Sequence, residues 1–272
     1  MPGPPVSRMI GHLVFGEVAT AVQASSVLCL PMGSIEQHGP HLPLDTDCVI
    51  AEALTRRVVA RWGDEHDLWQ LPLVPVGLSR EHAWAAGTLS LTVSGMTAYL
   101  RDLACEIARA LPARHLLIVN GHGGNRGILE ALMREMCADF GLNIATLHLG
   151  AMMSPDTGAD VPEIHAGKDE TSLMLVLAPE LVRRDAISAL KPAPGGEAAR
   201  ALVFDPAASY PWSSDDPRLS ASGIMGDPRG ASAAHGEIIL ARMIEGAGAI
   251  IRRLKDNAPV ANKTARRVTR ER

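Results

Sequence analysis

The chain has 272 residues, of which 47% are hydrophobic and 21% charged, and its formal net charge is −4. This length allows one large α/β domain with a sizeable core. The slightly negative net charge does not indicate binding to nucleic acid or to an anionic membrane. No apolar run reaches the roughly 18–20 residues that span a bilayer, and the opening segment MPGPPVSRMIGH lacks the pattern of a signal peptide.

Short apolar runs alternate with longer amphipathic segments along the first part of the chain. Residues 26–33 (SVLCLPMG), 71–77 (LPLVPVG) and 114–121 (RHLLIVNG) are predicted to be strands buried on both faces. Residues 46–62 and 94–111 carry apolar side chains at helical spacing and are predicted to be helices. Such alternation is typical of a parallel sheet.

The same pattern continues in the second part of the chain. Residues 125–141 are predicted to be a helix, 142–150 (LNIATLHLG) a strand and 168–179 a further helix. Residues 190–232 are rich in Pro, Gly, Ser and Ala, and a loop region of this length is more often functional than idle, as a lid or an oligomer contact. Residues 235–254 are predicted to be the last helix.

Residues with capping chemistry stand at the expected helix ends. Asp45, Ser94 and Asn125 are placed to cap helix N-termini, and Gly141 lies where a helix commonly stops. The fold class predicted from this order of elements is α/β, with a largely parallel sheet covered by helices on both sides.

No repeat and no linker divides the sequence. One domain is therefore expected over residues 1–272, with a core at about 10–255 and a basic, flexible tail at 256–272. Four cysteines are scattered without a CxxC pair: Cys29, Cys48, Cys105 and Cys137. They are interpreted as reduced thiols of a cytoplasmic protein.

Side chains that bind metals crowd the segments after two predicted strands. The motif GSIEQHGPHLPLDTD follows the first strand and NGHGGN follows the third, and ligands of open parallel sheets bind beyond the carboxyl ends of strands. Glu36 and His38 are two residues apart, so in extended backbone their side chains point to the same side. Asp47 can approach them where its helix begins, and His122 is flanked by glycines that leave room for its ring.

A third segment, EIHAGKDETS, adds Glu163, His165, Asp169 and Glu170. Two histidines and three carboxylates suit a pair of divalent ions, and a carboxylate that bridges two ions about 3.5–4 Å apart holds a hydroxide between them. The constellation therefore predicts hydrolysis. Glu170 has a second interpretation as a first-turn acid stabilised by the helix dipole. Asp169 has only that interpretation and is not included in the site.

Other candidate groups have simpler explanations. A single histidine is more often structural than a ligand, and four are interpreted in this way: His12, His66, His115 and His148. His41 has two interpretations that stay open: a hydrogen bond that supports the loop, or a contact with metal. NGHGGN lacks the lysine of a P-loop, and no GxSxG elbow is present, so neither a nucleotide site nor a nucleophilic triad is predicted.

The motifs GSIEQHGPHLPLDTD, SREHAWAAGTLSL, NGHGGN and HAGKDETSLML together resemble the creatininase family of amidohydrolases, in order over about residues 25–180. The segment GIMGDPRGASAAHGE also resembles the family. The resemblance implies a three-layer α/β/α sandwich with a mostly parallel central sheet, and a homohexamer. It also implies two divalent metal ions per chain, with zinc as the first choice and manganese or iron as alternatives.

The resemblance implies five metal ligands: Glu36, His38, Asp47, His122 and Glu170. Asp47 is expected to bridge the ions, with Glu36 and His122 at one and His38 and Glu170 at the other. His165 matches the histidine that assists catalysis, and we expect it to donate a proton to the leaving nitrogen. Glu81 and His82 in SREHAW are candidates for substrate contact, from this or a neighbouring subunit, or else a polar loop anchored by hydrogen bonds.

Two departures from creatininase proper count against creatinine as the substrate. Gly124 stands where that enzyme carries a glutamate ligand, two residues after the histidine of the glycine-rich loop. The pocket wall at 84–87 reads WAAG, where the family often has a Phe-Pro-Gly sequence.

The predicted activity is metal-dependent hydrolysis of a C–N bond other than an ordinary peptide bond, in a small amide, lactam or formamide, by a hydroxide that bridges the ions. One alternative is the opening of a lactone or cyclic ketone by the same hydroxide. The other is a non-catalytic, metal-stabilised scaffold subunit. The expected partners are the small-molecule substrate and further copies of the chain, without nucleic acid or membrane.

Overall fold

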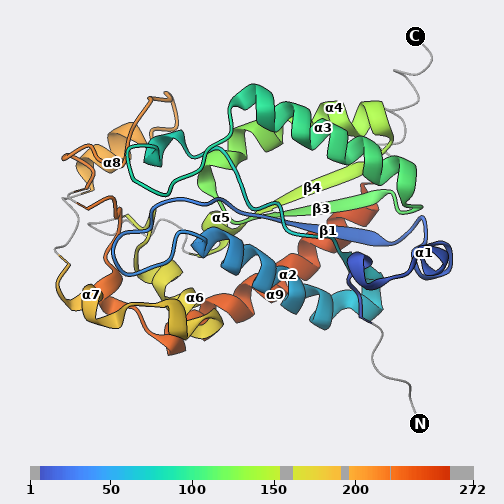
Figure 1. Cartoon of the computed structure of the whole chain (residues 1–272), viewed down its shortest axis with the longest axis horizontal. Helices are drawn as coiled ribbons and strands as arrows, with labels where there is room; N and C mark the ends of the chain where they lie inside the picture. Colours follow the sequence, from blue (N-terminus) through green and yellow to red (C-terminus); the bar gives the residue numbers. More distant parts are fainter. Residues whose placement is uncertain (1–6, 154–161, 191–195, 221, 258–272) are drawn as a thin grey trace.

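The fold is built around a parallel β-sheet, seen edge-on in the computed structural model of Figure 1. Among the described residues the sheet has four strands, in the order β2-β1-β3-β4. Their bounds are β1 Val27–Met32, β2 Leu68–Gln70, β3 His115–Asn120 and β4 Asn143–His148. The structure describes residues 7–153, 162–190, 196–220 and 222–257.

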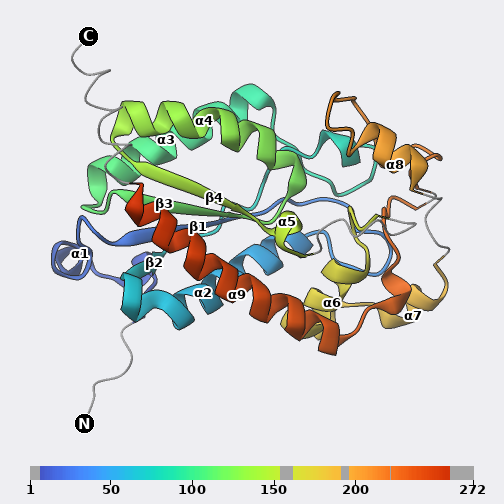
Figure 2. The same cartoon turned by 180° about the vertical axis from the view of Figure 1, so that it is seen from behind.

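Helices cover both faces of the sheet. Figures 1 and 2 show α3 and α4 on one face and α2 and α9 on the other. The bounds of these helices are α2 Thr46–His66, α3 Val93–Ala110, α4 Arg126–Phe140 and α9 Ala233–Asp256. The predicted three-layer α/β/α sandwich is confirmed.

Alternation along the strands divides the core in two. Leu28 and Leu30 of β1 pack in one buried cluster with side chains of α3 and α4. Val27 and Cys29, which point the other way, pack in a second cluster with side chains of α2, α6 and α9. A strand buried on both faces therefore reads as a continuous apolar run, which is the pattern that predicted it.

Shorter elements complete the described chain. The α-helices are α1 Phe15–Ala21, α5 Leu149–Met153, α6 Lys168–Leu177, α7 Arg184–Ser188 and α8 Glu197–Leu202. The 3-10 turns are η1 Ile10–His12, η2 Arg80–His82, η3 Gly123–Asn125, η4 Pro179–Leu181 and η5 Pro228–Gly230. Both α8 and η5 lie within 190–232, so that region is less irregular than expected.

The prediction of a strand at 71–77 is wrong. The strand is β2, at Leu68–Gln70, and it ends just before that segment. Leu71 N donates to Cys29 O at 2.9 Å and Val74 N to Pro31 O at 3.0 Å, but no regular ladder continues. The reason is that 71–77 contains two prolines, which have no N–H to give to a neighbouring strand.

The predicted helix caps are partly correct. Gly141 ends α4 in the left-handed conformation, with φ 65°, as expected. The cap of α3 is Thr92 and not Ser94, since the Thr92 hydroxyl accepts from Gly95 N at 3.0 Å. Asp45 and Asn125 hold the N-cap positions of α2 and α4, but neither side chain makes a capping bond. The Asn125 side chain has another use in the site.

The order of the strands places a switch point between β1 and β3. From β1 the chain continues through α2 to β2 at one edge, and from β3 it continues through α4 to β4 at the other. Ligands in open α/β sheets bind beyond the carboxyl ends of the strands at such a point. The loops that leave β1 and β3 there are the two that carry the predicted motifs.

No helix of the described residues has the length and apolar character needed to cross a membrane. Of the predicted basic tail, residues 258–272 lie outside the described part of the chain. The single domain stays a prediction.

Candidate metal centre

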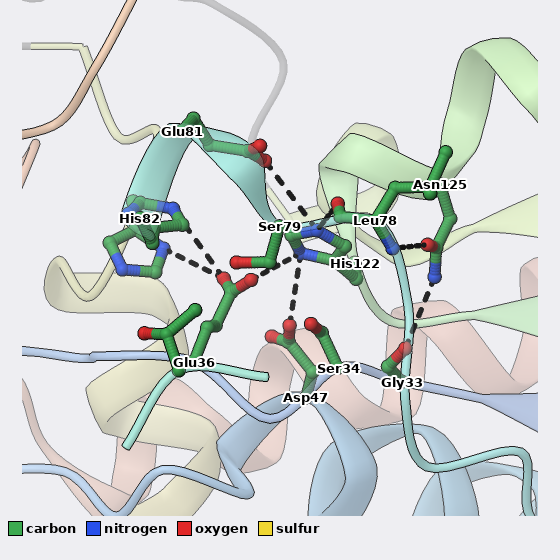
Figure 3. Close-up of polar contacts among 12 residues, drawn as sticks. Gly33, Ser34, Glu36, Asp47, Leu78, Ser79, Glu81, His82, His122 and Asn125 are labelled. Carbon is green, nitrogen blue, oxygen red and sulfur yellow. Dashed lines mark hydrogen bonds and ion pairs between the residues drawn. The ribbon is translucent and has the colours of Figure 1, made fainter. Parts of the chain in front are cut away.

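The loops after β1 and β3 bring four of the predicted ligands together. Glu36 and His38 follow β1, Asp47 lies in the first turn of α2, and His122 follows β3. Figure 3 shows the His122 ring with the carboxylates of Glu36 and Asp47 on one side. All four residues are at most 4% exposed, so their charges are shielded from water.

Asp47 lies between the two histidines. One carboxylate oxygen, Oδ1, is 3.2 Å from His38 Nε2, and the other, Oδ2, is 3.1 Å from His122 Nδ1. Glu36 Oε2 is also 3.1 Å from His122 Nδ1. Two ligands each about 2.0–2.1 Å from a tetrahedral zinc lie roughly 3.3 Å apart, so each of these pairs of atoms has the spacing of two ligands of the same ion.

Backbone carbonyls orient both imidazoles. His122 Nε2–H donates to the Leu78 carbonyl at 2.7 Å, and His38 Nδ1–H donates to the Glu36 carbonyl at 3.1 Å. The other ring nitrogen of each histidine then faces Asp47, and once deprotonated it presents a lone pair there. A histidine that ligates a metal usually donates its second ring N–H in this way.

When the imidazoles of the site are neutral, several of its atoms are buried without a hydrogen-bond partner. They are Glu36 Oε2, Asp47 Oδ2 and His38 Nε2, all of which face the shared space between the side chains. A buried acceptor without a hydrogen-bond donor costs about 1–3 kcal/mol, more when it is charged. Divalent ions would satisfy all three atoms, and the nitrogen and oxygen donors suit zinc or manganese. The residues present therefore fit the metal that the sequence predicts.

The acidic and imidazole side chains of the site shift one another's pKa values. Burial alone would raise the pKa of Glu36, but the charge and hydrogen bond of the His122 imidazole hold it well below its usual range. Burial alone would lower the pKa of His122, yet Glu36 and Asp47 hold it well above. Burial opposes the charged form of His38 too, and Asp47 nevertheless raises its pKa to about 9. In the metal-free protein, protons on these imidazoles take the places of cations, and metal binding would displace them.

Glu170 approaches the same centre from α6. Its side chain offers an oxygen that lies within 4.8 Å of ligand atoms of His38 and Asp47. Its Oε2 accepts from Ala166 N at 2.5 Å, and Ala166 has a left-handed φ of 54°. Burial raises the pKa of Glu170 to about 7, against the pull of His38. The structure places Glu170 beside His38 and Asp47, and its role as a ligand stays a prediction.

His165 lies beside the centre with a fixed ring. Its Nε2–H donates to the Gln37 carbonyl at 2.7 Å, and Nδ1 is 3.6 Å from Glu36 Oε1. The ring centroid is 4.4 Å from that of His38 and 4.1 Å from that of His82. Burial, with His38 and His82 nearby, holds the pKa of His165 well below its usual range. Nδ1 is thus the nitrogen that is free to exchange a proton.

The two residues predicted to contact substrate flank this arrangement. His82 Nε2 is 3.6 Å from Glu36 Oε1, and Glu81 Oε1 is 3.5 Å from His122 Nε2 (Figure 3). Glu81 has ligand-like spacing to Glu36 and His122, which the sequence did not indicate. It lies on the Nε2 side of His122, however, away from the nitrogen that faces Asp47.

Gly124, where creatininase proper has a glutamate, has no room for a side chain. A Cβ there would lie 2.2 Å from the Leu78 carbonyl oxygen and 2.5 Å from Glu81 Oε1. A carboxylate ligand from this loop is therefore not available, and Glu170 stays the acid predicted for the second ion.

Sequence reasoning missed three side chains that hold the site together. Asn125 accepts from Leu78 N at 2.9 Å and donates to Gly33 O at 3.1 Å, so it joins the loops on either side of His122. Gln37, inside the first motif, contacts both His82 and His165. Ser214 contacts His82 from a remote segment. The place of Gln37 between Glu36 and His38 was a usable signal, whereas nothing local marked Ser214.

The remaining histidines behave as support. His41 Nε2 pairs with the Thr171 hydroxyl at 2.9 Å, which ties the first motif to α6. Asp169, left out of the site, pairs with His235 at 2.7 Å. Among the described residues, no group with metal-binding spacing includes any of the four histidines interpreted as structural: His12, His66, His115 and His148.

The sequence matches the family model described as "Creatininase: Creatinine amidohydrolase" over residues 12–251. A mycofactocin precursor peptide peptidase from Mycobacterium ulcerans (strain Agy99) is 36% identical over 245 residues, which cover 85% of this chain and 89% of that one. A creatinine amidohydrolase from Pseudomonas putida is 29% identical over 90% of this chain and 96% of its own length.

Among solved structures, a mutant creatininase of Zn-Zn type superimposes with a TM-score of 0.72 and 27% sequence identity. The match covers 91% of this chain and 98% of that chain. The fold is therefore shared along almost the whole length of both chains.

Proposed function

The chain belongs to the creatininase family and is a metal-dependent amidohydrolase that acts on C–N bonds; we propose that its substrate is a short peptide, in which it hydrolyses one specific amide. The name of the M. ulcerans relative, a precursor peptide peptidase, supports this choice. This proposal departs from the sequence prediction of a C–N bond other than an ordinary peptide bond, because an amide between two residues of a short peptide is itself a peptide bond.

The proposal of hydrolase activity depends above all on one observation, the position of Asp47 between two buried imidazoles. We propose that it bridges two ions, one held with Glu36 and His122 and the other with His38 and Glu170. Zinc is the first choice, with manganese as an alternative. Bound there, divalent ions supply a Lewis acid and an activated water.

His165 is proposed to move the proton. Because its Nε2–H is held by the Gln37 carbonyl, Nδ1 is the nitrogen that would take up a proton from the attacking water beside Glu36 and return it to the leaving nitrogen. His82 and Glu81 are proposed to contact the substrate. His82 is suited to this role because its Nε2 points to the same space as His165 Nδ1, 3.6 Å from Glu36 Oε1.

A cyclic amide is the second candidate substrate. The P. putida relative, a creatinine amidohydrolase, aligns over nine-tenths of the chain and supports a lactam in the same site. The absence of room at Gly124 counts against creatinine itself, because the second ion then has different ligands from those of creatininase proper.

Elemental analysis of the purified protein tests the centre. We expect two ions per wild-type chain and about one in Glu170→Ala, with two retained in the control Glu237→Ala, which removes an exposed glutamate of α9. One ion in both the wild type and Glu170→Ala would exclude Glu170 as a ligand. No metal in carefully prepared wild type would favour the scaffold instead.

Mass spectrometry of substrate mixtures tests the activity. The metal-loaded protein is incubated with short peptides, creatinine and other lactams, formamides, a lactone and casein. Release of a fragment from a short peptide, with casein intact, supports the peptide proposal. Turnover of lactams alone supports the second candidate, and turnover of the lactone alone supports the ring-opening alternative.

Assembly, location and domain organisation are part of the same proposal. We propose a homohexamer, a cytoplasmic location and a single domain over residues 1–272. All four cysteines are free thiols, which supports a reducing compartment.

A further inference from the structure

Residues 212–220, named here the strap, cover the outer wall of the metal centre, although they are remote from it in sequence. They lie in the Pro-, Gly- and Ser-rich region that sequence reasoning could not place. Ser214, at the centre of the strap, is fully buried and makes hydrogen bonds to Gln37 and to the wall that begins at η2. A buried hydroxyl with several partners marks a fixed junction.

Ser214 joins the two faces of that wall. Its Oγ is 2.7 Å from His82 Nδ1 and accepts from Trp84 Nε1 at 2.8 Å. Its backbone N donates to the Glu81 carbonyl at 2.9 Å. Trp84 is 48% exposed while His82 is 2% exposed, so one hydroxyl links an outer and an inner residue of the site.

The Gln37 amide fixes which nitrogen of His82 carries the hydrogen. Gln37 Oε1 accepts from Gly39 N at 3.0 Å, so the other end of the amide is the NH₂ group. That group donates one hydrogen to the Gly223 carbonyl at 3.0 Å. Its neighbour His165 Nε2, at 3.1 Å, already donates to the Gln37 carbonyl, so the other hydrogen is directed at His82 Nδ1 at 3.0 Å. His82 Nδ1 is therefore an acceptor, and Nε2 carries the hydrogen, which points at the space beside Glu36.

The strap has a hydrophobic cluster of its own. Leu219 packs with Ala199 and Met225, and Trp212 lies against this cluster. The Trp212 ring also meets His82 edge-on, with centroids 6.2 Å apart. These contacts hold the strap in place without Ser214, so loss of one hydroxyl should leave the strap folded.

We propose that Ser214 is a positioning residue, which, together with Gln37, presents His82 Nε2–H to the substrate and holds Trp84 at the outer side of the site. This inference rests on the proposed function for the identity of the substrate. His82 then acts as a fixed hydrogen-bond donor to a carbonyl or carboxylate oxygen of the bound peptide, and Trp84 packs against an apolar part of it. Ser214 itself touches neither metal nor substrate.

The test compares Ser214→Ala with Ser213→Ala. Ser213 is the neighbouring residue of the strap, and its hydroxyl bonds to the Glu81 carbonyl and Asp215 but not to His82 or Trp84. With the peptide substrate, Ser214→Ala should raise KM on the order of tenfold, the effect of one lost hydrogen bond, with kcat within about threefold and metal content unchanged. Ser213→Ala should match the wild type.

A spectroscopic readout separates this inference from the proposed function. In histidine-labelled protein, the ring-nitrogen shifts of His82, assigned by their loss in His82→Asn, should report the Nε2–H form in the wild type and change in Ser214→Ala. Unchanged shifts in Ser214→Ala would overturn the positioning role, and so would an altered ring with an unchanged KM. If the wild type hydrolyses no amide, the proposed function fails, while the ring-nitrogen shifts still decide whether Ser214 positions His82.

Discussion

The metal-free protein should lose stability as the pH rises from 7 to 9. In that form His38 is a buried imidazolium beside Asp47, with its pKa raised from 6.5 to about 9. The folded chain therefore holds a proton that the unfolded chain releases above pH 6.5. A group of this kind contributes stability that is fully present below its unfolded pKa and is lost as the pH rises through its folded pKa.

The size of the effect follows from the difference between the two pKa values of His38. At about 1.4 kcal/mol per pH unit, the difference is worth about 3 kcal/mol, most of which is lost between pH 7 and 9. His122, whose pKa is also held well above its usual range, adds to the loss with the same sign. Bound metal should reverse the trend relative to the metal-free protein, because binding requires the deprotonated imidazoles.

Urea unfolding of the chelated protein at pH 7, 8 and 9 measures this loss of stability. The same series on the metal-loaded protein measures how far its stability exceeds that of the chelated protein, a difference that should grow with pH. Chelated His38→Gln is the control, because it should lose only the part of the slope that belongs to His38. Stability of the chelated wild type that stays level or rises from pH 7 to 9 would refute the protonated pair, and with it the view that protons replace the ions.

Three further predictions concern single positions of the site. Gly124→Ala should lower the free energy of unfolding, measured in urea, by on the order of 2–3 kcal/mol, because its Cβ would meet the Leu78 carbonyl. Gly123→Ala is the control and should change it by no more than about 0.5 kcal/mol, because a Cβ there has nothing within 4 Å. Equal effects of the two substitutions would contradict the packing around Gly124. His165→Ala should lower kcat about 10²–10⁴-fold with both ions retained, and unchanged turnover would remove His165 from the mechanism. Asp47→Asn should lower the metal content at both sites, so two full ions by elemental analysis would defeat the bridge.

Most of the layout of the chain could be predicted from local pattern. Strand β1 is buried on both faces and β3 almost wholly so, and both read as unbroken apolar runs, while the helices show their buried faces at regular spacing. The failure at 71–77 has a local cause as well: apolar content suggested a strand, but two prolines interrupt the pairing there. Ser94 was chosen as a cap although Thr92, two residues earlier, makes the bond.

The candidate site was predictable where its residues share one short segment and unpredictable where they do not. Glu36 and His38 belong together by spacing alone, and Asp47 and His122 follow from the rule that ligands gather beyond strand ends. The Leu78 carbonyl that orients His122 is a backbone group, which no residue type reveals. Ser214 is a serine in a region full of small polar residues, so only the fold shows its contact with His82.

This division explains why the sequence predicted the reaction better than the substrate. The groups that would bind metal come from three compact motifs, and their chemistry is fixed by residue type: carboxylates and imidazoles suit divalent ions wherever they converge. The groups that would face the substrate are set by long-range contacts, in which the strap holds Trp84 and His82 through one hydroxyl. A change in the strap could therefore alter which amide fits while the metal centre stays the same, so the substrate must be sought by testing the wall and not the ligands.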